Sequence, residues 1–259
     1  TLHTGTARNG GGAYERPFLT LFVLDQRGRL ARGEWFDDDR AAEALARFDE
    51  LTASAALQPT TRRRVTPNAA TRDLERQWSA IEAHDVEAIT ALNAQVKVIH
   101  HPTGATYGAP EIATLFRGLW RGTNLRATQE ILATLGDSLV LSRRSASHDG
   151  VDARFGSVGP VDVEYVHVSQ VDEHGRAQHA EVFAADRLAD AVVRLYERHA
   201  ELLPEGSEKV RAAATAASFA VFKDAAFDPK RFAQALAPDF ESVDHRHLSS
   251  WSLRGADAY

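Results

Sequence analysis

The chain has 259 residues, a net charge of −6 at pH 7 and an apolar fraction of 44%, values that are ordinary for a soluble globular protein. The modest, dispersed charge argues against a nucleic-acid-binding surface, and the absence of cysteine excludes disulfides, thiolate nucleophiles and cysteine metal ligands. Because the sequence shows neither a signal peptide nor an apolar run of about 18 residues, we expect a cytoplasmic protein without a membrane partner.

The stretch from Tyr14 to Leu51 recurs later in the chain, at a spacing of 147 residues. Aligned without gaps on Val161–Arg198, it is identical at eleven of 38 positions, against roughly two or three expected by chance. The identical pairs are Asp25/Asp172, Gly28/Gly175, Arg29/Arg176, Glu34/Glu181, Phe36/Phe183, Asp39/Asp186, Arg40/Arg187, Ala42/Ala189, Ala44/Ala191, Arg47/Arg194 and Glu50/Glu197. A second match aligns Leu92–His101 with Leu236–His245 at a spacing of 144.

These matches predict a tandem repeat of one structural unit. We interpret residues 1–51 as the C-terminal part of a first copy, 52–65 as a linker, 66–203 as a complete copy and 204–259 as the N-terminal part of a third copy. Because the chain lacks methionine and starts and stops inside copies, we expect it to be a piece of a longer polypeptide.

The complete copy is expected to begin with helices. Apolar residues at spacings of four and three predict a helix over 71–83, and they are Leu74, Trp78 and Ile81. Asp85 is a typical N-cap for a second helix that ends at Leu92. After a brief strand over 96–99, Pro110 favours the start of a third helix. The apolar stripe of that helix comprises Ile112, Leu115, Phe116, Leu119 and Trp120.

The second half of the copy is expected to consist of strands. Residues 128–135 and 138–147 flank Gly136-Asp137, a two-residue turn suited to an antiparallel hairpin. Further strands are predicted over 151–155, 161–171 and 177–183, and a helix over 186–202 closes the copy. The residues of that helix expected to face inward are Leu188, Ala191, Val192 and Leu195. Helices followed by antiparallel strands indicate an α+β fold, a curved, cone-shaped sheet packed by N-terminal helices.

The element order, the segment His-His-Pro-Thr-Gly-Ala-Thr-Tyr-Gly at 100–108 and the segment Glu-Val-Phe-Ala-Ala-Asp-Arg-Leu at 181–188 resemble a nuclear-transport-factor-2-like, or SnoaL-like, domain. More narrowly, they are similar to tandem copies of that domain in large actinobacterial multidomain regulatory proteins. The resemblance implies a cystatin-like cone, frequent dimerisation through the sheet face and a cone pocket. In some members, such as polyketide cyclases and ketosteroid isomerase, that pocket is catalytic, whereas other members bind or scaffold.

His101 is one candidate for proton transfer, because an imidazole titrates near neutral pH. His100 and His101 follow the first strand, and His245 is the counterpart of His101 in the third copy. The structural alternative is a histidine that bonds nearby backbone and fixes the following loop. Adjacent histidines on a strand point to opposite faces, so we expect no metal site.

Glu181 is the second candidate, with His179 and Phe183 on the same strand face. A carboxylate in a partly apolar pocket can have a raised pKa and act as a base. The alternative is a salt bridge to Arg143, Arg144 or Arg187. Since His179 becomes Arg32 in the first copy, we expect that no acid–base pair recurs as a unit.

A binding site for an apolar small molecule is predicted to include His101, Tyr107, Trp120, His167 and Glu181. Each of these residues also has a structural interpretation, since aromatic residues at helical spacing are commonly core and a histidine on a strand is commonly hydrogen-bonded. Without a nucleotide-binding or hydrolase motif, we expect no cofactor.

The leading hypothesis is therefore a set of tandem modules in a larger regulatory protein, acting as non-catalytic interaction or small-molecule-binding units. Their expected partners are other copies of the module, the rest of the polypeptide, a second chain through the sheet face or an apolar ligand. The rival hypothesis is an enzyme of the SnoaL or ketosteroid-isomerase kind, with His101 or Glu181 as the base. A pure oligomerisation module is the third.

Overall fold

The computed structural model describes residues 2–6, 13–53, 65–150, 159–223, 228–247 and 252–255. Two compact units make up the chain. Unit 2 is Val65–Ala212, whereas unit 1 combines Thr1–Arg64 with Ala213–Tyr259. The sequence places the end of the complete copy at 203/204, and the structure divides the units within helix α6 (Ser207–Phe219). The two flanking pieces, separated by the whole of unit 2 in the sequence, thus form one unit.

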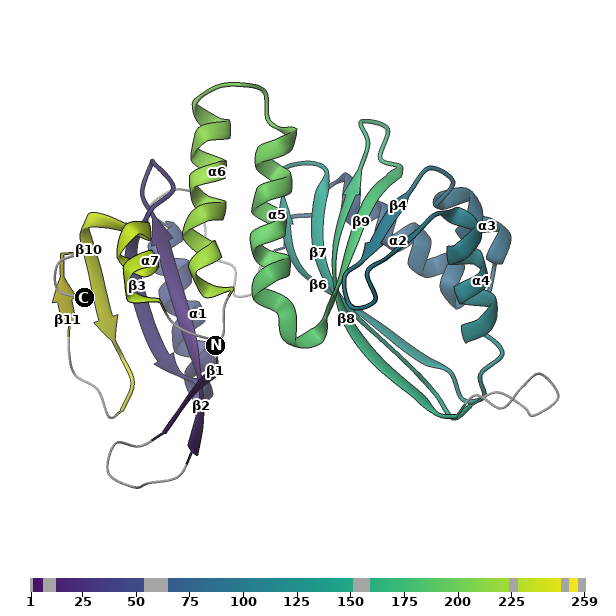
Figure 1. The fold of residues 1–259 in the computed structure, drawn as a ribbon, viewed down its shortest axis with the longest axis horizontal. Coiled ribbons are helices and arrows are strands. Elements are labelled where there is room, and N and C mark those ends of the chain that lie inside the picture. Colours follow the sequence, from purple (N-terminus) through teal and green to yellow (C-terminus); the bar gives the residue numbers. More distant parts are fainter. Residues whose placement is uncertain are drawn as a thin grey trace. The chain divides into compact units, whose positions relative to one another are not determined.

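Unit 2 is an α+β fold, as the sequence predicts (Figure 1). Its helices are α2 (Ala69–Glu82), α3 (Val86–Leu92), α4 (Ala109–Leu119) and α5 (Leu188–Leu202), with a 3-10 turn η3 (Ala185–Arg187) before α5. Its strands are β4 (Lys97–His100), β5 (Ala105–Tyr107), β6 (Arg126–Leu135), β7 (Leu139–His148), β8 (Val161–Val171) and β9 (Ala177–Ala184). The sheet order is β5-β4-β9-β8-β7-β6, antiparallel except for the parallel pair β4 and β9.

Local chemistry explains where the first helices begin. Asn68 accepts a hydrogen bond from the Thr71 backbone N–H, and the Thr71 hydroxyl accepts one from the Asn68 N–H, so α2 starts with a capping box. The Asn68 amide also donates to the carbonyls of Gly136 and Leu139, which ties this helix end to the β6–β7 hairpin. Asp85 caps α3 through the Ala88 N–H, which confirms the prediction.

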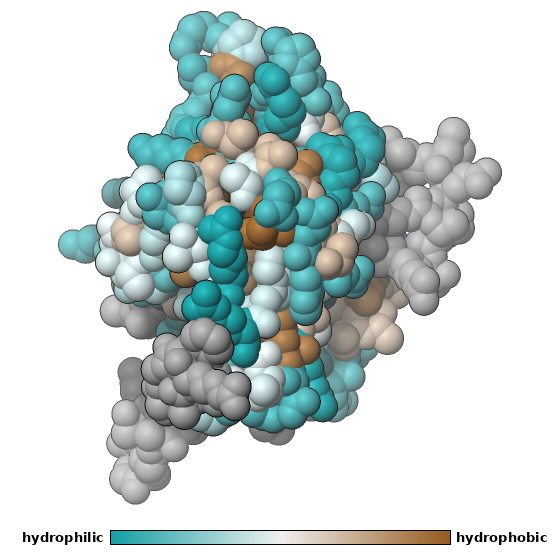
Figure 2. Space-filling model, turned by 90° about the vertical axis from the view of Figure 1, so that its right-hand side faces the viewer, coloured by the Kyte–Doolittle hydropathy of each residue, from teal (hydrophilic) through white to brown (hydrophobic). Residues whose placement is uncertain are grey.

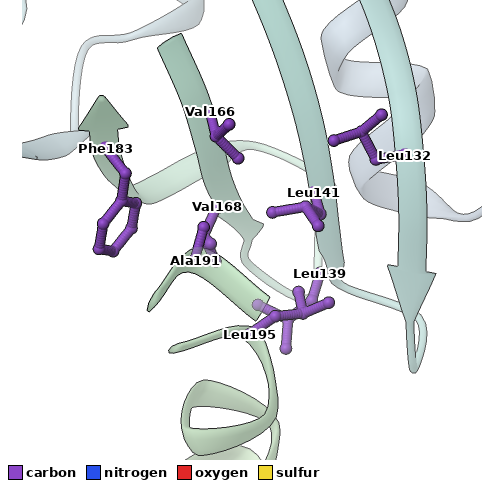
Figure 3. Close-up of a cluster of buried hydrophobic side chains, with 8 residues drawn as sticks. All are labelled: Leu132, Leu139, Leu141, Val166, Val168, Phe183, Ala191 and Leu195. Atoms are coloured by element: carbon purple, nitrogen blue, oxygen red, sulfur yellow. The ribbon is translucent and has the colours of Figure 1, made fainter. Parts of the chain in front are cut away.

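Helices cover both faces of the unit 2 sheet (Figure 1). On one face, α5 packs Ala191 and Leu195 against strand residues in the largest apolar cluster (Figure 3). That cluster is completed by Leu132, Leu139, Leu141, Val166, Val168 and Phe183. On the other face, α2 places Ala70 and Leu74 against β7 and β8. A further cluster joins α2, α3 and α4, with Trp78, Phe116 and Trp120 partly buried at its margin.

Two details of unit 2 differ from the sequence prediction. Leu135 pairs directly with Leu139, so the hairpin loop has three residues rather than two, and it begins with Gly136 at a φ of 58°. Leu115 is 55% exposed, although the helical stripe predicted it to be buried. The buried direction of α4 centres on Ile112 and Phe116, and Leu115 lies on the far margin of that stripe. The strand predicted over 151–155 lies outside the described residues.

Unit 1 contains β1 (Leu2–Thr6), β2 (Ala13–Leu24), β3 (Leu30–Asp37), the 3-10 turn η1 (Asp38–Arg40) and α1 (Ala41–Ala53) from the start of the chain. From the end of the chain it contains most of α6, the 3-10 turn η4 (Ala220–Phe222), α7 (Pro229–Ala235), β10 (Leu236–Asp244) and β11 (Ser252–Arg254). The sheet order is β1-β2-β3-β10-β11, and β10 pairs with β3 in parallel.

The two matching stretches of sequence form the same elements in the same order. Strand, turn, strand, 3-10 turn and helix follow one another in β2–β3–η1–α1 and again in β8–β9–η3–α5. The identical Asp, Gly and Arg residues build the turn. Asp25 accepts from the backbone N–H of Arg29, and Asp172 likewise accepts from that of Arg176. The glycine within each turn has a positive φ, of 79° at Gly28 and 70° at Gly175.

The molecular surface seen in Figure 2 is mostly hydrophilic, and its apolar residues form separate patches. Among the helices that the structure describes, none combines the length and the hydropathy needed to cross a bilayer.

Candidate functional site

The pairing of the strands assigns each candidate residue to one of the two sheet faces. On β8, Val166 and Val168 face α5 (Figure 3). Tyr165 and His167 therefore lie on the opposite face, toward α2. Strand pairing carries this assignment across the sheet. His167 pairs with Val182, which pairs with His100, whereas Glu181 lies on the α5 face. The sequence-predicted site is thus divided between two faces.

Glu181 is the centre of a hydrogen-bonded cluster on the α5 face. Its side chain is buried, with Oε1 accepting from His179 Nε2 at 2.9 Å and from Arg194 Nε at 2.6 Å. Oε2 lies 2.8 Å from His101 Nε2. The His101 ring also stacks on Phe183, with 4.3 Å between ring centroids. His101 and Glu181 are therefore brought together, and both carboxylate oxygens are occupied by donors.

The donors around Glu181 determine its charge. Burial by itself raises the pKa of this carboxyl group, but hydrogen bonds from His179, Arg194 and His101 outweigh it and lower the pKa to about 2. Glu181 is therefore ionised at neutral pH, the opposite of the raised pKa that a general base in an apolar pocket would have. The predicted partners Arg143, Arg144 and Arg187 do not form the salt bridge, which is made by Arg194 of α5.

The same cluster occurs in unit 1. Glu34 is fully buried, with His245 Nε2 at 2.8 Å from Oε2 and Arg47 Nε at 3.1 Å from both oxygens. Arg32 takes the place of His179. The ring of His245 stacks on Phe36 as that of His101 stacks on Phe183. The prediction that no His–Glu pair recurs is wrong, because the second pair joins residues from opposite ends of the chain.

We call Glu181–His101–Arg194 and Glu34–His245–Arg47 the two carboxylate clusters. Each cluster joins three side chains from different elements. They are a histidine directly after a parallel strand, a glutamate on the neighbouring strand and an arginine on the helix that follows. The backbone N–H of His101 also donates to Val182, and that of His245 donates to Trp35. These hydrogen bonds connect the parallel strand to the neighbouring strand and to the helix that follows it. Such connections between elements support a structural role for the clusters.

The opposite face of the unit 2 sheet carries a group of aromatic and basic side chains. His100 lies 5.2 Å from Tyr165 and 5.8 Å from Tyr107, measured between ring centroids. The Tyr165 ring contacts that of His167, and Arg144 is the strand partner of Tyr165. We call His100, Tyr107, Arg144, Tyr165 and His167 the inner-face group. It contains two of the residues predicted to bind ligand, Tyr107 and His167.

Electrostatics within the inner-face group keep its histidines neutral. Burial, the Arg144 guanidinium and the nearby His100 hold the pKa of His167 well below its usual range. Burial and the adjacent His101 lower the pKa of His100. Burial also lowers the pKa of Arg144 to about 10, although the charge of Asp73 opposes this shift. At neutral pH the group is therefore one cation beside two neutral imidazoles.

Several buried polar atoms near this face lack a hydrogen-bond partner among the described residues. They are Ser142 Oγ, Arg144 Nε, Gln129 Oε1 and Trp120 Nε1. Strand pairing places Gln129 beside Arg144 and Ser142 beside His167, so three of these atoms belong to residues on the inner face. A buried polar atom without a partner costs about 1–3 kcal/mol, and such atoms in a native fold call for an explanation.

Trp120 lies at the end of α4, among apolar residues. Its ring stacks on His84, with centroids 5.2 Å apart, and contacts Phe116 at 5.5 Å. Together with Trp78 and Tyr107, it packs against the cluster that joins α2, α3 and α4. Trp120 thus combines the expected core packing with an indole N–H that has no hydrogen-bond partner in the part of the chain that the structure describes.

Four residues on the inner face were not among the predicted ligand-binding residues: His100, Gln129, Ser142 and Arg144. Because side chains alternate along a strand, Ser142 and Arg144 were expected to share one face of β7. The sequence did not indicate which face of the sheet that would be. The repeat contained a signal for the pairing of Arg194 with Glu181, because Arg47/Arg194 and Glu34/Glu181 are both among the eleven identical pairs. No group of three or more His, Asp or Glu side chains suited to a metal ion occurs in the described part of the chain.

Comparison with known proteins identifies solved structures alone. No family model matches the chain, and no curated protein matches it. A Mycobacterium tuberculosis protein in complex with estradiol-17beta-hemisuccinate is 19% identical, with a TM-score of 0.38, over 46% of this chain and 97% of that one. Delta 5-3-ketosteroid isomerase from Mycobacterium sp. is 17% identical, with a TM-score of 0.37, over 45% of this chain and 93% of that one.

A cystatin fold protein from Novosphingobium aromaticivorans is 13% identical, with a TM-score of 0.36, over 46% of this chain and 99% of that one. The elements of unit 2 establish the architecture by themselves: the chain contains an α+β unit whose curved sheet is covered by helices on both faces.

Proposed function

We propose that unit 2 binds a small molecule on the inner face of its sheet, and that the ligand pairs an apolar body with an anionic or hydrogen-bond-accepting group. One observation carries this proposal, the buried Ser142 hydroxyl and Arg144 Nε that have no hydrogen-bond partner among the described residues. A ligand oxygen beside Arg144 and Ser142 would satisfy these groups, and aromatic side chains from α2 and α4 would contact the apolar body.

In this proposal the module is a binding unit, and the carboxylate cluster of Glu181 is structural. Glu181 is ionised, its oxygens are occupied, and it lies on the α5 face, away from the inner-face group. The recurrence of the cluster as Glu34 with His245 supports a role common to both units. We also propose that the repeated modules belong to a larger cytosolic regulatory protein, a view based on the sequence repeat.

The test is ligand binding with variants on opposite faces of one strand. The probes are 8-anilinonaphthalene-1-sulfonate and estradiol-17beta-hemisuccinate, which each join an anionic group to an apolar body. We expect Arg144→Gln to weaken binding at least tenfold. Arg143→Gln, one residue away on the opposite face, should leave it unchanged. Absence of saturable binding by the intact chain, or equal effects of both variants, would contradict the proposal.

Proton transfer on the inner face is the second candidate function, because the Arg144 guanidinium interacts electrostatically with the His167 imidazole. A neutral imidazole beside a cationic Arg144 can take a proton from a carbon acid whose enolate the guanidinium stabilises. The measurement is exchange of α-hydrogens of a ketosteroid probe in deuterated water. Exchange that His167→Gln abolishes and Glu181→Gln retains supports catalysis at this face, whereas an exchange rate equal to the rate without protein excludes it for that substrate.

A further inference from the structure

Asp73 of α2 is a buried acidic residue that the binding site described above does not use. It is 2% exposed, and it lies on the side of α2 that faces the sheet, where Ala70 and Leu74 pack against β7 and β8. A buried charge is costly unless other charges or hydrogen bonds compensate it. The groups around Asp73 therefore indicate which further charges this face of the sheet can accept.

Neighbouring side chains of α2 hold Asp73 in place. Its Oδ1 accepts a hydrogen bond from Arg76 Nη2 at 2.8 Å, and its Oδ2 accepts one from Gln77 Nε2 at 2.5 Å. Burial raises the pKa of Asp73, whereas the Gln77 and Arg76 side chains and the charge of Arg144 oppose this rise. Because both oxygens accept from donors, the arrangement fits an ionised carboxylate.

Arg144 and Asp73 act on each other through their charges. Arg144 contributes to lowering the pKa of Asp73, and Asp73 contributes to raising that of Arg144. The hydrogen bonds that Asp73 accepts come from its own helix, however. Arg144 Nε has no hydrogen-bond partner in the described part of the chain. The guanidinium thus keeps this donor for a ligand, beside a negative charge that is already present.

These charges set the balance on the inner face. Among the strand residues that the structure describes on this face, Arg144 is the charged one, since His100 and His167 are neutral at pH 7. The Arg76 side chain is 49% exposed, so water screens its charge and it offsets Asp73 only in part. One negative charge on a ligand would neutralise Arg144. A second one would meet no further cation on these strands and would be repelled by Asp73.

We propose that Asp73 is a specificity-determining residue of the inner face and that it limits the ligand to one negative charge. A carboxylate, a sulfonate or a sulfate ester meets this condition. A phosphate monoester, with a charge of about −2 at pH 7.5, does not. The inference rests on the proposed binding function of the inner face. It adds the charge of the ligand, and it assigns a role to a residue of α2 that contacts neither the anion nor Arg144 by a hydrogen bond.

The experiment compares two ligands that differ by one charge. Estradiol 17β-sulfate and estradiol 17β-phosphate share an apolar body and a tetrahedral anionic group, and isothermal titration calorimetry of the intact chain at pH 7.5 measures the affinity of each. We expect the sulfate to bind at least tenfold more tightly than the phosphate. Asp73→Asn removes the charge and keeps the shape of the side chain, so it should reduce this ratio at least fivefold, mainly by strengthening phosphate binding.

Glu75→Gln is the matched control. It removes the same charge from α2 at an exposed position two residues away, and it should leave the ratio of the two affinities unchanged. The ratio is measured within one variant, so a substitution that disturbs the site without changing its charge preference weakens both ligands and does not alter it. A purely structural Asp73 would therefore leave the ratio as it is.

The unsubstituted chain tests the inference even if Asp73→Asn fails to fold. Equal affinities for the two esters, or tighter binding of the phosphate, overturn it and leave the binding function standing. So does binding of estradiol-17beta-hemisuccinate without binding of the sulfate, because charge then does not decide which ligand is accepted. A ratio that Asp73→Asn leaves unchanged, or that Glu75→Gln lowers equally, overturns the role of Asp73. If none of the three ligands binds, the binding function fails and the inference fails with it.

Discussion

Replacing Glu181 by glutamine tests the carboxylate cluster of unit 2. The hydrogen bonds around Glu181 lower its pKa from 4.5 to about 2. Since one pKa unit is worth about 1.4 kcal/mol, the ionised carboxylate contributes on the order of 3 kcal/mol to the stability of unit 2 at pH 7. Glutamine removes this charge and one of the three carboxylate partners of Arg194, so we expect Glu181→Gln to lower the free energy of unfolding by about that amount.

The pH dependence gives the sign of the effect. A carboxyl group whose pKa is lowered by folding stabilises the protein fully above its unfolded pKa, and this contribution is lost as the pH falls through the folded pKa. For Glu181, the window runs from about pH 4.5 down to about 2. The difference between the unsubstituted chain and Glu181→Gln should therefore be largest at pH 7 and roughly half as large at pH 3.

The assay is urea unfolding followed by amide hydrogen exchange of β8 and β9, which reports unit 2 separately from unit 1. Glu34→Gln is the matched control, because it removes the corresponding carboxylate from unit 1 and should leave exchange in β8 and β9 unchanged. A loss below about 1 kcal/mol, or a loss that is the same at pH 7 and pH 3, would refute the reasoning.

Five further substitutions test packing and helix capping, each by thermal unfolding. Leu195→Ala should cost about 2–4 kcal/mol because Leu195 is 3% exposed, whereas Phe48→Ala at the corresponding exposed position should cost under about 1 kcal/mol. Gly122→Ala should destabilise, since its Cβ would lie 2.4 Å from His148 Cγ, and Gly118→Ala in α4, with open space, should stabilise by up to about 1 kcal/mol. Asn68→Ala should cost about 1–2 kcal/mol through the lost cap, and no loss would contradict the capping role.

Side-chain periodicity was a good guide to the elements of unit 2. It predicted β8 at the residues where the structure has it and the inward face of α5 with Ala191 and Leu195, and residue type predicted the cap at Asp85. These features depend on residues that are close together in the sequence. The prediction for Leu115 was wrong, because the width of the buried stripe on α4 depends on which helices pack beside it.

The candidate site was only partly predictable. His101, His167 and Glu181 were each recognised as chemically capable, yet the sequence grouped them into one pocket. The structure separates His101 and Glu181 from His167, because a strand residue changes face with each step and the phase of β9 is set by packing on α5. Arg194 reaches Glu181 from a different element, so nearness in sequence could not reveal the pair.

The sequence by itself determined that one strand–turn–strand–helix pattern occurs twice. The repeated residues form turns and helix faces, and these features depend on residues that are near one another in the sequence. Tertiary structure alone decided that Glu34 meets His245 across most of the chain and that β3 pairs with β10. It also decided that Leu45 and Phe48 of α1 stay exposed. Parallel pairing and burial depend on segments far apart in the sequence, and their free energy is gained only when those segments pack together.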